Sequence, residues 1–113
     1  MKKYFSPKDL KIWLQQEVQK PALVDVREDQ ELDIARLPFS FIHLPLSEAS
    51  VWIETFSEQI STDSPVVVVC HAGIRSWNFG LWLIEKKLGY DVWNLDGGID
   101  AWSKTVDSTV PRY

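Results

Sequence analysis

Hydrophobic residues occur along the chain in short runs that end at charged or turn-forming residues, and such runs predict β-strands. The predicted strands cover residues 22–26, 39–45, 66–70 and 91–98. The third of these runs, VVVVC, is the strongest, because it has no polar position on either face. Strands that are apolar on both faces are typical of the centre of a parallel sheet that helices cover on both sides.

A first helix is predicted ahead of these strands, where apolar residues recur every three or four positions. Ser6 is suited to the N-cap and Pro7 to the first helical position, and Asp9 completes a capping box with Ser6. The apolar positions that follow are Leu10, Trp13, Leu14 and Val18. The helix should end before Pro21, because the residue before a proline disfavours helical geometry.

Three further helices are predicted at residues 47–59, 76–89 and 99–106. In the second of them, Leu81, Ile84 and Leu88 form one apolar stripe, and Gly89 is placed to stop the helix. Strands and helices thus alternate over most of the chain. This alternation predicts an α/β fold with a mainly parallel sheet covered on both sides, in a single domain of residues 1–113.

Composition and charge exclude several classes of protein. With 113 residues, 45% of them apolar and 25% charged, the chain is expected to be one soluble globular domain. Its net charge of −4 disfavours nucleic acid, because a phosphate-binding surface is usually basic. No apolar run is long enough to cross a membrane, and the N-terminus lacks the apolar run of a secretory signal. We therefore expect neither a nucleic-acid partner nor a membrane partner.

The chain has a single cysteine, Cys70, and this limits its chemistry. One thiol can form neither an internal disulfide nor a cysteine-rich zinc site. The two histidines, His43 and His71, do not have the spacing of metal ligands. We therefore expect no metal, and a reducing, cytoplasmic location.

Cys70 lies where the strongest predicted strand meets a helix, and ligands of α/β sheets bind at the carboxyl ends of strands. Residues 71–75 form a short loop whose backbone N–H groups can turn inward, with Gly73 providing the freedom for a tight turn. The helix N-terminus and Arg75 add positive charge, which favours the reactive thiolate. The alternative is a buried cysteine that acts only as a small apolar residue. The pattern Cys-x-x-Gly-x-Arg-Ser favours a reactive cysteine over a buried apolar one.

The segment CHAGIRS, residues 70–76, resembles the active-site loop of the rhodanese family of sulfurtransferases. Three other segments resemble this family in the same order, namely LVDVRE at residues 23–28, IHLPLSE at 42–48 and LDGGIDAW at 95–102. The closing VDSTVPRY resembles tails of rhodanese domains fused to adenylyltransferases of the MoeB and ThiF type. Residues 35–41, ARLPFSF, depart from the Gly-His-Ile that the family commonly has there.

The resemblance implies a three-layer α/β/α fold with a mainly parallel sheet of about five strands. It also implies a two-step sulfur transfer in which Cys70 is the nucleophile. Cys70 takes the outer sulfur of thiosulfate or a persulfide donor and passes it to cyanide, a thiol or a protein acceptor. No cofactor is implied beyond the covalent persulfide, and a monomer is expected.

The resemblance further implies that the loop residues bind the substrate. These residues are His71, Ala72, Gly73, Ile74, Arg75 and Ser76. Backbone N–H groups of the loop would stabilise the persulfide, and Arg75 would help to bind an anionic donor. Ser76 would either contact the thiolate or cap the next helix. His71 is expected to face solvent, with a modest functional role beside the nucleophile as the alternative, and His43 is expected to be structural.

Asp25 and Arg27 are expected to support the site from the end of the first predicted strand, residues 22–26, with architecture favoured over direct chemistry. Arg27 is predicted to pair with Glu31. Trp77, just after the loop, is a candidate contact for a protein acceptor.

Two other classes of function remain as alternatives. Cysteine-dependent phosphatases and arsenate reductases also place a cysteine and an arginine in a loop before a helix. Here four residues separate Cys70 from Arg75, whereas phosphatases have five. A reductase normally needs a second, resolving cysteine, which the chain lacks. The second alternative is a non-catalytic binding or regulatory module of rhodanese-like fold. Modules of that kind have typically lost the cysteine that is present here.

Overall fold

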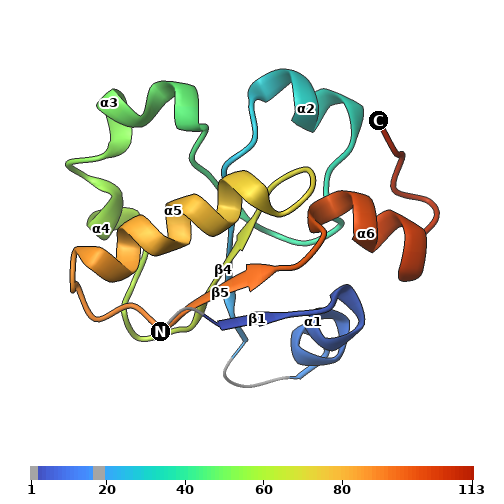
Figure 1. Ribbon diagram of the computed structural model, residues 1–113, viewed down its shortest axis with the longest axis horizontal. Coiled ribbons are helices and arrows are strands. Elements are labelled where there is room, and N and C mark those ends of the chain that lie inside the picture. The colour runs from blue at the N-terminus through green and yellow to red at the C-terminus, as the bar shows by residue number, and fades with distance from the viewer. Residues whose placement is uncertain (1–2, 17–19) are drawn as a thin grey trace.

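The protein forms a five-stranded parallel sheet between helices in the computed structural model, which describes residues 3–16 and 20–113 (Figure 1). The strands are β1 (Lys3–Phe5), β2 (Ala22–Asp25), β3 (Ile42–His43), β4 (Val66–Val69) and β5 (Val92–Leu95). Their order across the sheet is β1-β5-β4-β2-β3, and every neighbouring pair is parallel. This confirms the predicted α/β fold.

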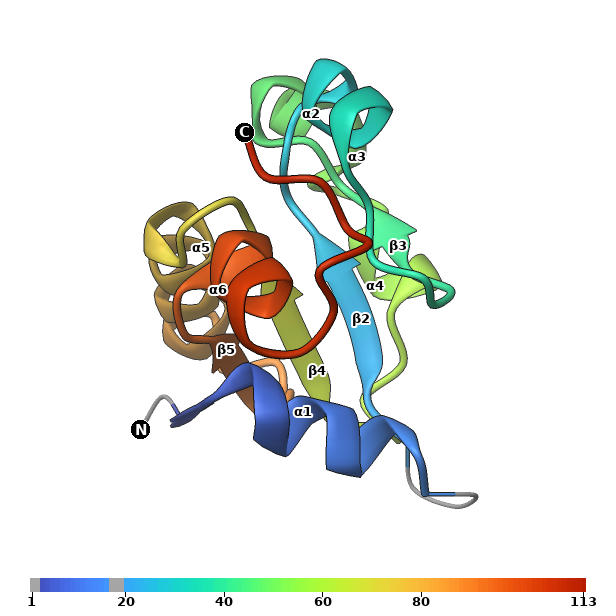
Figure 2. The same ribbon diagram turned by 90° about the vertical axis from the view of Figure 1, so that its right-hand side faces the viewer.

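Helices cover both faces of the sheet (Figure 2). They are α1 (Pro7–Leu14), α2 (Asp29–Ile34), α3 (Ala49–Trp52), α4 (Phe56–Gln59), α5 (Ile74–Glu85) and α6 (Gly98–Thr105), with a 3₁₀ turn η1 (Leu46–Glu48) before α3. All four valines of β4 are buried, and they alternate between two apolar clusters. Val66 and Val68 pack with residues of α3, α4 and α5, whereas Val67 and Val69 pack with residues of α1 and α6. The two-sided apolar pattern of VVVVC therefore marks the centre of the sheet, as predicted.

The start of α1 agrees with the prediction, because the Ser6 hydroxyl accepts from the Asp9 backbone nitrogen at 3.2 Å. The helix ends at Leu14, and Val18 lies outside the described residues. The single helix predicted for residues 47–59 is wrong, since this segment folds as η1, α3 and α4. The Thr55 hydroxyl donates to the carbonyl of Trp52 at 3.4 Å, and such side-chain bonds compete with a continuous helix.

The apolar stripe predicted for the helix after the loop is also wrong. Leu81 and Leu88 are exposed by 38% and 47%. The helix α5 starts two residues earlier than predicted, and its buried residues are Ser76, Phe79, Gly80 and Leu83. These positions follow the spacing of one helical face, so α5 packs on the sheet through the face that also carries the loop serine.

Two elements were not predicted from the sequence. The strand β1 has three residues and pairs only with β5, so its local signal is weak. Half of the residues of helix α2 are charged, and Leu32 is its one buried residue. A hydrogen bond of 2.9 Å from the Glu28 backbone nitrogen to the Glu31 carboxylate closes its first turn.

Candidate active site

Cys70 directly follows β4 and is almost completely buried, with 1% of its surface exposed. The loop after it turns back, so that the backbone N–H of Gly73 donates to the Cys70 Sγ at 3.0 Å. Gly73 has a φ of +96°, and a Cβ there would lie 3.0 Å from the backbone nitrogen of Gly97. This turn therefore needs a glycine. The sulfur thus accepts a hydrogen bond from a backbone N–H at the start of α5.

Two buried polar side chains lie beside the sulfur. The Ser76 Oγ is 3.3 Å from the Cys70 Sγ and donates to the Asn94 Oδ1 at 2.5 Å. Asn94 donates from Nδ2 to the Gly73 carbonyl at 3.3 Å, which ties β5 to the loop. Because α5 begins at Ile74, Ser76 lies inside its first turn and contacts the sulfur, whereas Gly73 takes the cap position. Asn94 was missed from the sequence, where its one signal is a polar position within an apolar strand.

The N-terminus of α6 holds the other side of the loop. The backbone nitrogen of Ile99 donates to the Cys70 carbonyl at 2.9 Å, and that of Asp100 donates to the His71 carbonyl at 3.0 Å. This close approach depends on Gly98, because a Cβ there would lie closer than 3.0 Å to both carbonyl oxygens. The first half of the loop is thus fixed to a helix by backbone hydrogen bonds.

Asp25 and Arg27 form a buried ion pair at the carboxyl end of β2. The Asp25 carboxylate accepts from the Arg27 Nε at 3.0 Å and from its Nη2 at 2.8 Å. The predicted pairing of Arg27 with the Glu31 carboxylate is wrong, because the guanidinium folds back onto Asp25. The His43 Nε2 lies 2.6 Å from the Arg27 carbonyl, which places this histidine in a structural contact. A supporting role for Asp25 and Arg27 in catalysis stays a prediction.

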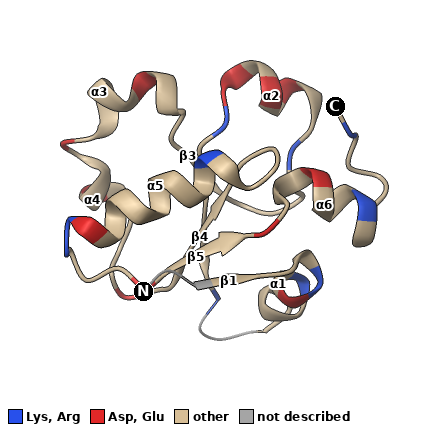
Figure 3. Cartoon of the chain, in the orientation of Figure 1, with Lys and Arg blue, Asp and Glu red and all other residues tan. Residues whose placement is uncertain are grey.

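Arg75, in the first turn of α5, binds a carboxylate of α2. Its Nη1 and Nη2 donate to the two oxygens of Glu31 at 2.8 and 2.7 Å. Figure 3 shows the acidic residues of α2 and the basic residue at the start of α5. The hydrogen bonds from Arg75 lower the pKa of Glu31 to about 2. Both terminal nitrogens of Arg75 thus contact Glu31, and its contribution to donor binding stays a prediction.

The ion pair between Glu31 and Arg75 should make the free energy of unfolding depend on pH. The pKa of Glu31 falls from 4.5 to about 2 on folding, so the stabilisation is complete above pH 4.5 and is lost as the pH falls toward 2. At pH 7 we expect Glu31→Gln to lower the free energy of unfolding by about 1–2 kcal/mol, a value reduced for solvent screening at the partly exposed Arg75. Urea unfolding between pH 3 and 7 measures this difference.

The difference in the free energy of unfolding between wild type and Glu31→Gln should become smaller below pH 4.5. Glu85→Gln, which removes an exposed carboxylate at the far end of α5, controls for the change in net charge. A difference that stays constant down to pH 3 would contradict the assignment of this pH dependence to the Glu31 carboxylate.

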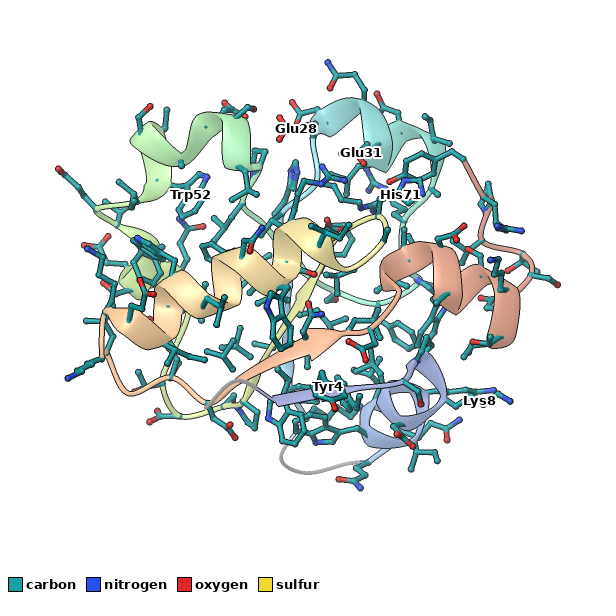
Figure 4. All side chains as sticks on the ribbon, viewed as in Figure 1. Tyr4, Lys8, Glu28, Glu31, Trp52 and His71 are labelled. Atoms are coloured by element: carbon teal, nitrogen blue, oxygen red, sulfur yellow. The ribbon has the colours of Figure 1, made fainter. Side chains whose placement is uncertain are left out.

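The outer half of the loop is open to solvent. Ala72 is exposed and Ile74 is 71% exposed. His71, which was expected to face solvent, is half-buried, because its ring packs on Tyr113 with 4.1 Å between the ring centroids. Figure 4 labels His71 and also Glu31 of α2, another side chain that Tyr113 contacts. Tyr113 was also missed from the sequence, which holds no local signal for a contact this distant.

An apolar groove of about 320 Å³ lies between α3 and α5, beside the loop. Its lining residues are Leu46, Ala49, Trp52, Ile53, Arg75, Asn78, Phe79 and Trp82. Trp52 is fixed there by a hydrogen bond of 2.9 Å from its indole nitrogen to the Pro45 carbonyl. The active-site loop therefore borders an apolar surface on the side of Arg75.

Within residues 3–16 and 20–113, no group of three or more His, Cys, Asp or Glu side chains is arranged to hold a metal ion. In the same ranges, no helix has the length and apolar character needed to span a bilayer.

Known proteins share this sequence pattern and this fold. A family model for the rhodanese-like domain matches residues 6–105, which includes the loop and all strands except β1. The chain belongs to the rhodanese-like domain family. A rhodanese-like domain protein from Staphylococcus aureus has the same fold, with a TM-score of 0.75 and 25% identity over 98% of each chain.

Two curated members of this rhodanese-like family are longer than the chain. Rhodanese-like/PpiC domain-containing protein 12, chloroplastic, of Arabidopsis thaliana is 35% identical over 80% of the chain, which spans 30% of that protein. Adenylyltransferase and sulfurtransferase MOCS3 of Drosophila persimilis is 33% identical over 80% of the chain, which spans 21% of that protein. The chain thus covers less than a third of these relatives, and the family to which it belongs includes named sulfurtransferases.

Proposed function

We propose that this protein is a sulfurtransferase that carries a sulfane sulfur as a persulfide on Cys70. The observation that carries this proposal is the position of the Cys70 Sγ, at the carboxyl end of the central strand and 3.0 Å from the Gly73 backbone nitrogen. Membership of the rhodanese-like family supports it. The comparisons favour neither a phosphatase nor a non-catalytic module.

The proposed reaction has two displacement steps. In the first, the Cys70 thiolate attacks the outer sulfur of thiosulfate, a bond forms between the two sulfurs, and the S–S bond of thiosulfate breaks to release sulfite. In the second, a nucleophilic acceptor attacks the terminal sulfur of the persulfide, and the electron pair returns to Cys70. The backbone N–H of Gly73 stabilises the Cys70 thiolate, which attacks in the first step and leaves in the second. The reaction needs no cofactor other than the covalent persulfide.

The burial of Cys70 favours small donors and acceptors. With 1% of the residue exposed, the sulfur is reached by a terminal sulfur atom more easily than by a bulky group. Thiosulfate and persulfides are the donors we propose, and cyanide, a thiol or a protein thiol the acceptors. A nucleophile that must stay reduced fits a reducing compartment such as the cytoplasm, and no second copy of the chain is needed to complete the loop.

Intact mass spectrometry after incubation with thiosulfate tests this function. We expect a gain of one sulfur atom, its removal by cyanide, and no gain in Cys70→Ser. The same measurement with a low-molecular-weight persulfide as donor separates thiosulfate specificity from sulfur transfer in general. If neither donor yields an adduct on the folded wild-type protein, the proposed function is wrong.

Ser76→Ala should slow the formation of the persulfide. The variant removes the hydroxyl that accepts from the Cys70 thiol at 3.3 Å and donates to Asn94. Because Asn94 in turn holds the Gly73 carbonyl, loss of its Ser76 partner leaves the Gly73 N–H less firmly directed at the sulfur. One lost hydrogen bond corresponds to a decrease in rate of about five- to tenfold. The rate of sulfur uptake from thiosulfate, followed by mass spectrometry, measures the effect.

Ser103→Ala is the matched control for this variant. Ser103 is buried in α6, and its hydroxyl donates to the Ile99 carbonyl at 3.1 Å, away from the sulfur. We expect its sulfur uptake to remain that of the wild type. Equal losses in the two serine variants would contradict a specific effect of the Ser76 hydroxyl.

A further inference from the structure

We infer that Tyr113 is a positioning residue of the active-site loop. Its side chain connects the buried ion pair at the end of β2 to the ion pair of Arg75 and to His71. This inference rests on the proposed function and names a residue that acts on the donor step. The segment that carries Tyr113, residues 106–113, follows α6 and runs from it toward α2 (Figure 2).

The hydroxyl of Tyr113 bridges two ion pairs. It accepts from the Arg27 Nη1 at 3.0 Å and donates to the Glu31 Oε1 at 2.9 Å. Arg27 is completely buried and held by Asp25, whereas Glu31 holds Arg75 of the loop. The phenol therefore places the Glu31 carboxylate, and with it Arg75, at a fixed distance from the end of β2.

The ring of Tyr113 supports the other end of the loop. Its centroid lies 4.1 Å from that of the His71 ring, with an interplanar angle of 69°. The His71 carbonyl is already held by the Asp100 backbone nitrogen. Tyr113 thus contacts His71 directly and also contacts Glu31, the partner of Arg75. His71 and Arg75 lie on either side of the turn at Gly73.

The segment after α6 is packed firmly enough to hold Tyr113 in place. Val110 is 5% exposed and belongs to the same apolar cluster as Trp102 of α6. The Asp107 carboxylate accepts from the Thr109 backbone nitrogen at 3.0 Å, which closes a turn. Arg112 donates from Nε to the Asp100 carboxylate at 2.9 Å. The position of Tyr113 is therefore set by α6, the helix that also fixes the first half of the loop.

Burial raises the pKa of Tyr113, and this effect outweighs the opposite effect of the hydrogen bond from Arg27. The phenol consequently keeps its proton near neutral pH and can donate to Glu31. The Glu31 carboxylate, which already accepts from Arg75 and from the Glu28 backbone nitrogen, gains a further donor in this way. Loss of the hydroxyl leaves this carboxylate with more freedom and also removes a partner of the buried Arg27 Nη1.

Steady-state kinetics of Tyr113→Phe test the inference, with thiosulfate and cyanide varied separately. In a ping-pong reaction, kcat/KM for the donor reports persulfide formation, and kcat/KM for cyanide reports the second step. We expect kcat/KM for thiosulfate to fall about three- to tenfold, as for one hydrogen bond to a charged group, with kcat/KM for cyanide within about twofold of wild type. Tyr113→Ala, which also removes the aromatic ring that packs on His71, should lower kcat/KM for thiosulfate further.

Tyr90→Phe is the matched control. The Tyr90 hydroxyl donates to the Ile60 carbonyl at 2.8 Å, near the start of β5 and at the opposite end of the sheet from the loop. We expect both kinetic parameters of this variant to equal those of the wild type. An unchanged donor parameter in Tyr113→Phe would overturn the inference. Equal losses in kcat/KM for thiosulfate and in kcat/KM for cyanide would overturn it too. A variant of which a smaller fraction is folded would lower both parameters alike.

Alkylation of Cys70 provides a readout that does not depend on sulfur transfer. Iodoacetate is anionic and iodoacetamide neutral, so the ratio of their rate constants reports the positive charge near the sulfur and cancels its intrinsic reactivity. We expect this ratio to fall about two- to fivefold in Tyr113→Phe, because Arg75 is less firmly held. If the wild type forms no persulfide but the ratio still falls, the proposed function fails and the positioning role of Tyr113 stands. An unchanged ratio overturns that role.

Discussion

Gly98→Ala is expected to destabilise the protein by about 2–5 kcal/mol and to displace the active-site loop, since strain and overpacking act together. Gly98 has a φ of +61°, which an L side chain adopts only under strain. The new Cβ would lie closer than 3.0 Å to the carbonyl oxygens of Cys70 and His71. These are backbone atoms held by α6, so no flexible side chain can move aside. Urea unfolding measures the loss of stability.

Gly89→Ala separates these two causes. Gly89 also has a positive φ, +88°, but no atom lies within 4 Å of the position of its Cβ. The control variant therefore carries only the backbone strain, about 1–2 kcal/mol. Sulfur uptake at Cys70 should be lost or greatly slowed in Gly98→Ala and unchanged in Gly89→Ala. Similar behaviour of the two variants would show that the contact of α6 with the loop has no special importance.

Arg27→Met is expected to lower the free energy of unfolding by about 3–5 kcal/mol, the usual loss when one partner of a buried ion pair is removed. Asp25 is 2% exposed, and its carboxylate accepts hydrogen bonds from the Nε and the Nη2 of the guanidinium. Methionine fills a similar volume, so the loss reports an uncompensated buried charge more than a cavity. Urea unfolding at pH 7 measures it.

The double variant Asp25→Asn/Arg27→Met tests this cause. It removes the charge that Arg27→Met leaves behind, so we expect it to be more stable than the single variant by about 1–3 kcal/mol. Arg112→Met is the matched surface control, since the Arg112 side chain is 54% exposed where it pairs with Asp100. Its effect should stay below about 1 kcal/mol. A double variant less stable than Arg27→Met would contradict the explanation.

Much of the fold could be predicted from the sequence, because the central strand carries a local signal. Four consecutive buried valines before Cys70 mark a strand that is apolar on both faces, and the alternation with helices follows from there. The short strand β1 and the helix α2 could not be predicted in this way. Their stability comes from pairing with β5 and from the hydrogen bond between Glu28 and Glu31, and not from a periodic apolar pattern.

The candidate site was predicted in part, for a similar reason. Cys70, Gly73 and Ser76 lie close together in the sequence, so their spacing can be recognised. Asn94 and Tyr113 reach the same site from β5 and from the segment after α6. Contacts over such distances depend on the order of strands and on the path of the chain after α6, which local patterns do not encode.

The short edge strands of the sheet limit how another protein can bind. The edges are β3, with two residues, and β1, with three. Such edges offer few backbone groups to which a strand of another chain could be added. A protein acceptor is therefore expected to dock through side-chain contacts at the carboxyl end of the sheet, where Ala72 and Ile74 are exposed. In that geometry, the acceptor thiol would be delivered to Cys70 on a projecting loop or terminus of the partner.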